Sequence, residues 1–231
     1  MRQGQAGFTL VELLVAVAIF AMVVAGMAVI YSTAFKQGTG LLTDTRLKAN
    51  SAVAMRAIQS ELAQATRLQL PLPNSSGKHL RGWTNVSPDV GPDGSTPVKL
   101  AMDNVVADRH WFHFCLQEGS AGGCNTTQNP VSCLFYYRGP DGAAWASTWG
   151  ITDANCGTTV GGVAPDLLAS SIVGFVANAP VAEGYFTRTS GSGVSEGNQV
   201  RVSFQMRQFA TPNSPPVEFT TDSTYSVQFA P

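Results

Sequence analysis

One carboxylate stands inside a long apolar stretch, and this placement is the first sign of chemistry in the sequence. Between Phe8 and Phe35, Glu12 is the only acidic or basic side chain. A carboxylate within the hydrocarbon of a bilayer costs roughly 2.5–3.5 kcal/mol on insertion scales, so residues of this kind usually mark a function. We therefore expect Glu12 to have a functional role that a plain membrane anchor would not explain.

Four cysteines form a second chemical set: Cys115, Cys124, Cys133 and Cys156. An even number of cysteines in a domain beyond a membrane segment predicts disulfides in an oxidising compartment. Four reduced thiols are the alternative, and a zinc site is not expected because the sequence has no C-x-x-C pair. Among the possible connectivities, Cys115–Cys124 with Cys133–Cys156 is favoured, since short loops cost the least entropy to close; the others stay open.

A serine motif in the C-terminal half is not expected to be catalytic. Gly193, Ser195 and Gly197 match the nucleophile-elbow pattern G-x-S-x-G. No apolar strand precedes this motif, and the histidine that should follow the serine is missing, because the last histidine is His113. We interpret the segment as a surface loop, and we expect no enzymatic activity.

Two other groups suggest a metal, and neither forms a convincing site. His110 and His113 lie near Cys115, but on a strand the two histidines point to opposite faces, one toward the core or a sheet edge and the other toward solvent. Asp89 and Asp93 lack the twelve-residue pattern of a calcium loop. No metal and no other cofactor is therefore expected. The tryptophans are expected in the core or against disulfides: Trp83, Trp111, Trp145 and Trp149.

The element that must position Glu12 is a membrane-spanning helix over residues 8–35. This stretch contains no proline, and as a helix it is about 42 Å long, enough to cross a bilayer. Arg2 precedes the apolar run, which predicts that the C-terminal domain lies outside the cytoplasm. A secretory signal cut near Gly26 is an alternative, but its apolar core should be about half as long.

The remainder of the chain predicts an α+β domain, a long helix followed by antiparallel strands. Residues 36–68 should continue the helix, with Leu47, Ala54, Ile58 and Ala65 on its buried face and with Pro71 and Pro73 after its end. Residues 69–97 are rich in Pro, Gly, Ser and Asn and predict a surface loop. Strands are expected at Val98–Met102, His110–Gln117, Cys133–Arg138, Ile172–Asn178, Gln199–Gln208 and Val217–Phe229.

The N-terminal residues carry a family resemblance. The segment Gly7-Phe8-Thr9-Leu10-Val11-Glu12 resembles the prepilin cleavage and methylation motif of type IV pilins and pseudopilins. The resemblance implies that a prepilin peptidase cuts between Gly7 and Phe8, that Phe8 is then methylated, and that Glu12 is the carboxylate used in assembly. Many major pilins have a proline in this helix, and its absence here leaves local unwinding of the helix an open point.

The head adds a second, compositional resemblance. Three segments are similar in sequence to J-type pseudopilins and PilW-like minor pilins: the helical segment Ala54–Ala65, the run Phe135-Tyr136-Tyr137 and the strand that ends at Phe229. A K-type tip pseudopilin is disfavoured because that type lacks the glutamate found here at Glu12.

These resemblances imply a domain plan: a leader over residues 1–7, an assembly helix over 8–35, an amphipathic continuation over 36–68 and a disulfide-containing β-rich head over 69–231.

The expected function is that of a minor pilin or pseudopilin that primes or caps a type IV pilus or a type II secretion pseudopilus. The implied partners are the prepilin peptidase, other pilins through the N-terminal helix, and an inner-membrane assembly platform. The implied location is the bacterial inner membrane with the head in the periplasm or outside, and then the filament. A binding module on the same anchor, a tip adhesin or DNA-uptake receptor, is the alternative, although a net charge of −1 disfavours nucleic acid.

Overall fold

The computed structural model describes residues 9–84, 110–118, 124, 132–140, 150–174, 185–189, 198–209 and 215–227. These residues form one long helix and nine strands. The helix is α1, Leu10–Gln64. The strands are β1 Ala65–Leu70, β2 Ser75–Gly77, β3 His79–Thr84, β4 His110–Glu118, β5 Ser132–Pro140, β6 Asp166–Gly174, β7 Phe186–Thr189, β8 Asn198–Phe209 and β9 Pro216–Val227.

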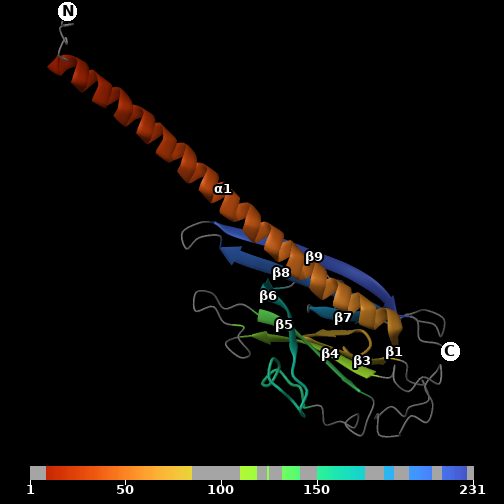
Figure 1. Ribbon diagram of the computed structural model, residues 1–231. Helices are drawn as coiled ribbons and strands as arrows, with labels where there is room; N and C mark the ends of the chain where they lie inside the picture. The colour runs from red at the N-terminus through yellow and green to blue at the C-terminus, as the bar shows by residue number, and fades with distance from the viewer. Residues whose placement is uncertain are drawn as a thin grey trace, which may run out of the picture.

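Helix α1 is continuous, and only its second half belongs to the head. Its 55 residues make a helix of about 80 Å. Figure 1 shows the N-terminal half projecting away from the sheet, and Leu47 is the first buried residue. The predicted buried face is confirmed, because Ala54 and Ile58 are fully covered and Ala65 lies just past the helix in the same core.

The predicted end of this helix was wrong. It stops at Gln64 rather than at residue 68, well before Pro71 and Pro73. Ala65 already has an extended backbone, and the residues that follow it pair with β3 as strand β1. Tertiary pairing has overridden a local sequence that is compatible with helix.

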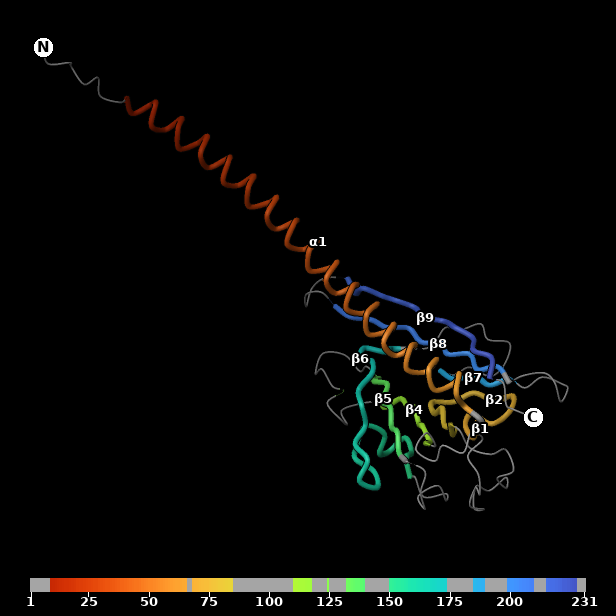
Figure 2. The backbone as a smooth tube through the Cα atoms, turned by 45° about the vertical axis from the view of Figure 1, so that its right-hand side comes forward, coloured from red at the N-terminus to blue at the C-terminus, as the bar shows by residue number. Residues whose placement is uncertain are grey.

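The strands form a single antiparallel sheet, which confirms the predicted α+β class. Its order is β1-β3-β4-β5-β6-β8-β7-β2, with β9 paired along the whole of β8. In Figure 2 the second half of α1 lies along β8 and β9, while β4 and β5 lie farther along the sheet. Arg188 of β7 donates to the carbonyl oxygens of Leu68 and Pro71, so the two ends of the sheet order approach each other.

Several strand predictions are confirmed, and one prediction of a loop is wrong. The segments around β4, β5, β8 and β9 are strands as expected, and β6 begins six residues before the predicted Ile172. Residues 69–84, however, contain the end of β1 and all of β2 and β3, where a loop was expected. The predicted strand at 98–102 lies outside the described residues.

The two faces of the sheet have separate cores. On the α1 side, alternate residues of the strands meet the helix stripe, including Phe112, Phe114 and Leu134 of β4 and β5 and Val200 and Phe204 of β8. On the other side of β3–β5, Trp83 and Trp111 share a smaller cluster with all four cysteines and with the segment 150–163. The prediction that these two tryptophans pack beside disulfides is confirmed; Trp145 and Trp149 lie outside the described residues.

The disulfides are Cys115–Cys156 and Cys124–Cys133. The predicted presence of disulfides is confirmed, but the favoured pairing of Cys115 with Cys124 and of Cys133 with Cys156 was wrong. Doubling a loop costs only about 0.6 kcal/mol, so loop length is a weak criterion. The strand register decides instead, because it places Cys115 on the outer face of β4, against which the segment containing Cys156 packs.

A buried carboxylate fastens the last turns of α1 to the sheet. Glu61 Oε2 accepts from His110 Nε2 at 2.8 Å and from Thr84 Oγ1 at 3.4 Å, and Glu61 Oε1 accepts a hydrogen bond from the Tyr136 hydroxyl. The Arg138 guanidinium lies 3.2 Å from His110 Nδ1 and can only donate, so Nδ1 accepts and Nε2 carries the hydrogen that reaches Glu61. Strands β3, β4 and β5 thus hold one point of the helix.

Peptide mapping under non-reducing conditions should find the two disulfide pairs described above. We expect the double variant Cys115→Ser/Cys156→Ser to lower the free energy of unfolding by about 2–5 kcal/mol, because the segment 150–163 loses its covalent tie to β4. A peptide that links Cys115 to Cys124 would contradict the pairing.

Tyr136→Phe should destabilise the protein by about 1–3 kcal/mol, because it removes a donor to a buried carboxylate. Tyr225→Phe is the matched control, since the Tyr225 hydroxyl reaches α1 only at 3.5 Å from the Met55 carbonyl oxygen, and we expect a smaller loss. Denaturant unfolding of both variants in detergent gives the comparison, and equal losses would contradict the role of Glu61.

The same cluster should make stability depend on pH. Burial raises the pKa of Glu61, but the hydrogen bonds from His110 and Tyr136, together with the electrostatic attraction of His110 and Arg138, outweigh it and leave the pKa below its usual 4.5. A carboxylate with a lowered folded pKa stabilises the fold above its ordinary value, and this stabilisation is lost as the pH falls through the folded value. The free energy of unfolding should therefore fall less steeply below pH 4.5 in Tyr136→Phe than in the parent protein.

Candidate assembly and processing site

The N-terminal half of α1 is an apolar rod without a partner in the described part of the chain. Its large side chains from Leu10 to Phe35 are exposed, and none of this segment is buried in the head. By length and composition it can cross a membrane. A core helix of similar composition would be mostly buried, so this segment needs a lipid environment or other helices to cover it.

Glu12 lies in the first turn of this rod, in a capping box with Thr9. The Thr9 hydroxyl accepts from the Glu12 backbone N–H at 3.3 Å. In return, Glu12 Oε2 accepts from the Thr9 backbone N–H at 3.0 Å and from its hydroxyl at 2.9 Å. The sequence forms this box because a Thr is followed three residues later by Glu at the start of an apolar run, and the helix N-terminus favours an anion there.

The capping box leaves part of the carboxylate available. Both hydrogen bonds from Thr9 go to Oε2, and within the described residues Oε1 has no partner. A carboxylate can accept several hydrogen bonds through its two oxygens. The geometry can therefore hold Glu12 in place within one chain and still offer one oxygen to a donor from another molecule.

The other residues predicted for this site lie outside the described part of the chain. Gly7 and Phe8, the predicted cleavage and methylation residues, precede Thr9 and are not described. The serine motif at 193–197 and the acids Asp89 and Asp93 also fall outside it.

The two histidines predicted to face opposite ways do so, but one part of that prediction was wrong. His110 faces α1 and bonds Glu61, while His113 faces the other side and contacts His79. Both are buried, so neither is solvated as expected, because the segment 150–163 covers the outer face of the sheet. Within the residues that the structure describes, no group of three or more His, Cys, Asp or Glu side chains could hold a metal ion.

Two polar clusters in the head were missed in the sequence. Glu61 could have been found, because it occupies a position of the buried stripe, three residues after Ile58. The second cluster joins His79, His113 and Asp153. No local pattern marks it, since β3, β4 and the segment 150–163 come together only in the folded head.

Comparison with known proteins identifies the N-terminal segment. Residues 2–28 match the family described as the prokaryotic N-terminal methylation motif. No curated protein and no solved structure matches the chain. The matched motif supports a type IV pilin-like protein that is processed by a prepilin peptidase, assembles with other pilins and is anchored in a membrane through its apolar helix.

Proposed function

We propose that this chain is a minor pilin or pseudopilin, a structural subunit that primes or caps a type IV pilus or a type II secretion pseudopilus. The observation that carries the proposal is Glu12, placed in the first turn of an exposed apolar helix within the methylation motif. The first half of this helix has no partner among the described residues, as expected of a segment that packs among other subunits. The compositional likeness of the head to J-type pseudopilins and PilW-like minor pilins supports the finer assignment.

Processing would prepare the helix for assembly. Cleavage between Gly7 and Phe8 removes the leader and creates an amine on Phe8, which the peptidase then methylates. Thr9 would become the second residue of the mature chain. The capping box of Thr9 and Glu12 starts just after the new terminus, so it can hold the first turn of the helix before and after cleavage.

Assembly would then pair two charges that are each costly in an apolar environment. The Phe8 amine of one subunit needs an anion, and Glu12 Oε1 of a neighbour is free of partners within the described residues. Such a buried pair is favourable only when its geometry is good. The pair would therefore fix the axial register between neighbouring helices.

The head would lie in the periplasm or outside the cell, with the helix as the single membrane span over residues 8–35. The two disulfides support an oxidising compartment for the head. An inner-membrane platform would extract the subunit from the bilayer during assembly. Residues 1–7 would be the leader, and residues 36–68 would be an amphipathic segment whose helix ends at Gln64 and whose last residues begin strand β1. Residues 69–231 would be the rest of the head.

The first experiment tests processing. Mass spectrometry of the membrane-extracted protein should give a mature chain that begins at methylated Phe8, and Gly7→Trp should block cleavage, because the peptidase must seat a small residue beside the scissile bond. Gly7→Ala should still be cut in part, and Gly4→Trp, a change of the same kind within the leader, should be cut normally. A start at Met1, or after Ala25 or Gly26, would contradict the assignment.

The second experiment tests the charge of Glu12. Glu12→Gln should be cleaved, membrane-held and correctly folded, yet should not enter filaments, because the amine of the neighbouring subunit is left without its anion. Incorporation is measured by recovery of the variant in sheared filaments and by its crosslinking to other subunits with a reagent that does not react with cysteine. Thr9→Val is the control: it removes the hydroxyl cap, keeps the carboxylate and should still be incorporated. Normal incorporation of Glu12→Gln would rule out the pairing.

A further inference from the structure

The exposed half of α1 changes character at Tyr31. From Leu10 to Ile30 every residue is apolar except Glu12, and this stretch of helix is about 31 Å long. The hydrocarbon of a bilayer is about 30 Å thick, so this stretch alone is long enough to cross it. When it does so, the residues that follow Ile30 lie among the lipid headgroups on the side of the membrane that carries the head.

Tyr31 and Phe35 form an aromatic pair at this point. Their rings are one helical turn apart, with centroids 6.5 Å from each other and an interplanar angle of 19°. The head leaves both side chains exposed, that of Tyr31 by 74% and that of Phe35 by 60%. Tyrosine has an apolar ring and a polar hydroxyl, and for this reason it is enriched where hydrocarbon meets headgroups.

The two hydroxyl side chains beside Tyr31 bond to the helix itself. Ser32 Oγ and Thr33 Oγ1 both donate to the Val29 carbonyl oxygen, at 3.0 Å and 2.9 Å. A polar group in hydrocarbon must find its partner within the protein, and these two have done so. They can therefore lie at the edge of the hydrocarbon without water, which is the depth that the apolar length gives them.

Lys36 adds a positive charge one residue after the aromatic pair. Its side chain is exposed, and the nearest acid along the helix, Asp44, bonds Lys48 instead, at 2.7 Å. From Tyr31 to Lys36 the helix rises about 7.5 Å, and the headgroup region on each side of the hydrocarbon is about 5–8 Å thick. A lysine at this level can lay its stem along apolar surface and reach a lipid phosphate with its ammonium group.

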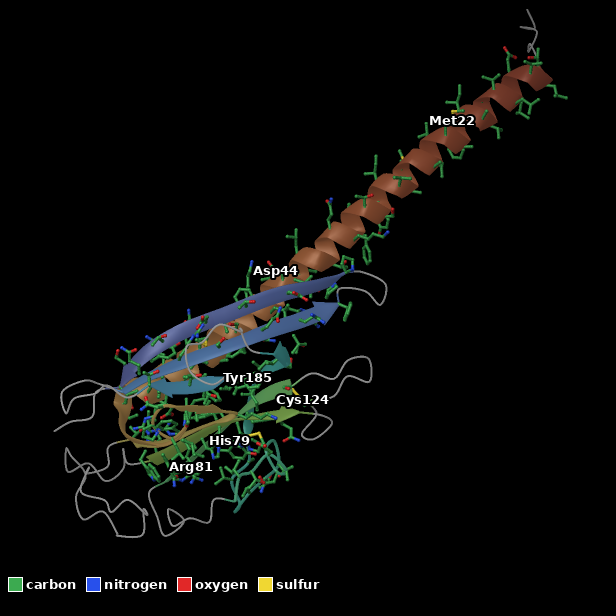
Figure 3. The ribbon with its side chains drawn as sticks, turned by 180° about the vertical axis from the view of Figure 1, so that it is seen from behind. Met22, Asp44, His79, Arg81, Cys124 and Tyr185 are labelled. Atoms are coloured by element: carbon green, nitrogen blue, oxygen red, sulfur yellow. A yellow bond between two sulfur atoms is a disulfide. The ribbon has the colours of Figure 1, made fainter. Side chains whose placement is uncertain are left out.

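The three side chains share a depth rather than a face of the helix. At about 100° per residue, Phe35 lies about 40° from Tyr31 around the axis, whereas Lys36 lies about 140° from it. A partner helix contacts one face, while a bilayer surrounds the helix at every level. Figure 3 shows Met22 on the projecting half, clear of the strands, and Asp44 where the helix reaches β8 and β9.

We propose that Tyr31, Phe35 and Lys36 form an anchor for phospholipid headgroups, in the leaflet nearer the head, and that this anchor sets the depth of the helix before assembly. Side chains on a helix lean toward its N-terminus, so both rings reach back toward the edge of the hydrocarbon. The proposal rests on the membrane location of the helix and not on which filament the chain enters.

The anchor places Glu12 at the opposite edge of the hydrocarbon. Glu12 lies 19 residues before Tyr31, which is about 28 Å along the axis and close to the thickness of the hydrocarbon. Before assembly the carboxylate and its capping box with Thr9 therefore meet the headgroups and water of the other leaflet. Movement of the subunit out of the bilayer toward the head draws Glu12 into hydrocarbon, where its charge needs a partner.

The test measures the depth of α1 in vesicles of phosphatidylethanolamine and phosphatidylglycerol. The full-length chain carries a spin label on Ala25→Cys, and within the described chain the native cysteines are all in disulfides. The label lies about 9 Å below Tyr31 along the axis. Its collision rates with oxygen and with a water-soluble nickel complex give its depth below the headgroups. Because the anchor holds the helix at one leaflet, we expect this depth to stay constant as the acyl chains are lengthened.

Three variants complete the test. Tyr31→Leu/Phe35→Leu removes the anchor, so the apolar stretch should centre itself and the label should sink by about half of any added thickness. Tyr31→Leu/Ala34→Tyr moves the phenol three residues along the helix and should place the label about 4–5 Å deeper. Phe20→Leu is the control, because it removes an equally exposed aromatic ring from the middle of the apolar stretch and should leave the depth unchanged.

The possible failures point to different causes. A label that sinks with added thickness in the parent chain, or the same depths in Tyr31→Leu/Phe35→Leu as in the parent, would overturn the anchor alone. A label open to the nickel complex at every thickness would overturn the membrane location of the helix as well. Loss of filament incorporation in Tyr31→Leu/Phe35→Leu, with its depth unchanged, would show that the aromatic pair contacts other subunits instead of lipid.

Discussion

The whole molecule depends on one helix whose two halves need different surroundings. From Leu10 to Phe35 the helix is apolar except for Glu12 and a few hydroxyl side chains, and no described residue of the head covers it. From Leu47 to Gln64 it has a single apolar stripe, which the sheet covers. Because the backbone hydrogen bonds run through both halves without a break, the head is held at a fixed place along a rod that must itself be buried in lipid or among other helices.

The second half of the helix packs against the sheet and forms one side of the hydrophobic core of the head. An apolar stripe alone would hold α1 on the sheet but would allow it to slide, since hydrophobic contacts are not directional. Glu61 removes that freedom, because donors from β3, β4 and β5 converge on one carboxylate. In the described part of the chain no helix covers the outer face of the same strands. The segment 150–163, the two tryptophans and the disulfides form a separate small core there.

Features encoded by local periodicity could be predicted, and features that depend on distant partners could not. Glu12 and the stripe from Leu47 to Ile58 were evident in the sequence, as was the alternation of Val200 and Phe204 in β8. Strand β1 was missed because its sequence is compatible with helix, and β3 because it follows a stretch rich in Pro, Ser and Gly. Both become regular only through pairing with each other and with β4. The partner of Cys115 and the contact of His79 with Asp153 are likewise set by the path of the segment 150–163, which no local pattern specifies.

We expect the rod to bend most easily at the junction between its two halves. Gly38 and Gly40 lie there, and a Cβ atom built on either would meet nothing within 4 Å, so packing within the chain does not require glycine. A glycine inside a helix costs about 1 kcal/mol relative to alanine, and both glycines precede Leu47, the first buried residue of the helix. A load between an embedded helix and a bulky head would therefore be relieved at this junction, while the capping box around Glu12 and the anchor at Glu61 keep the two ends in register.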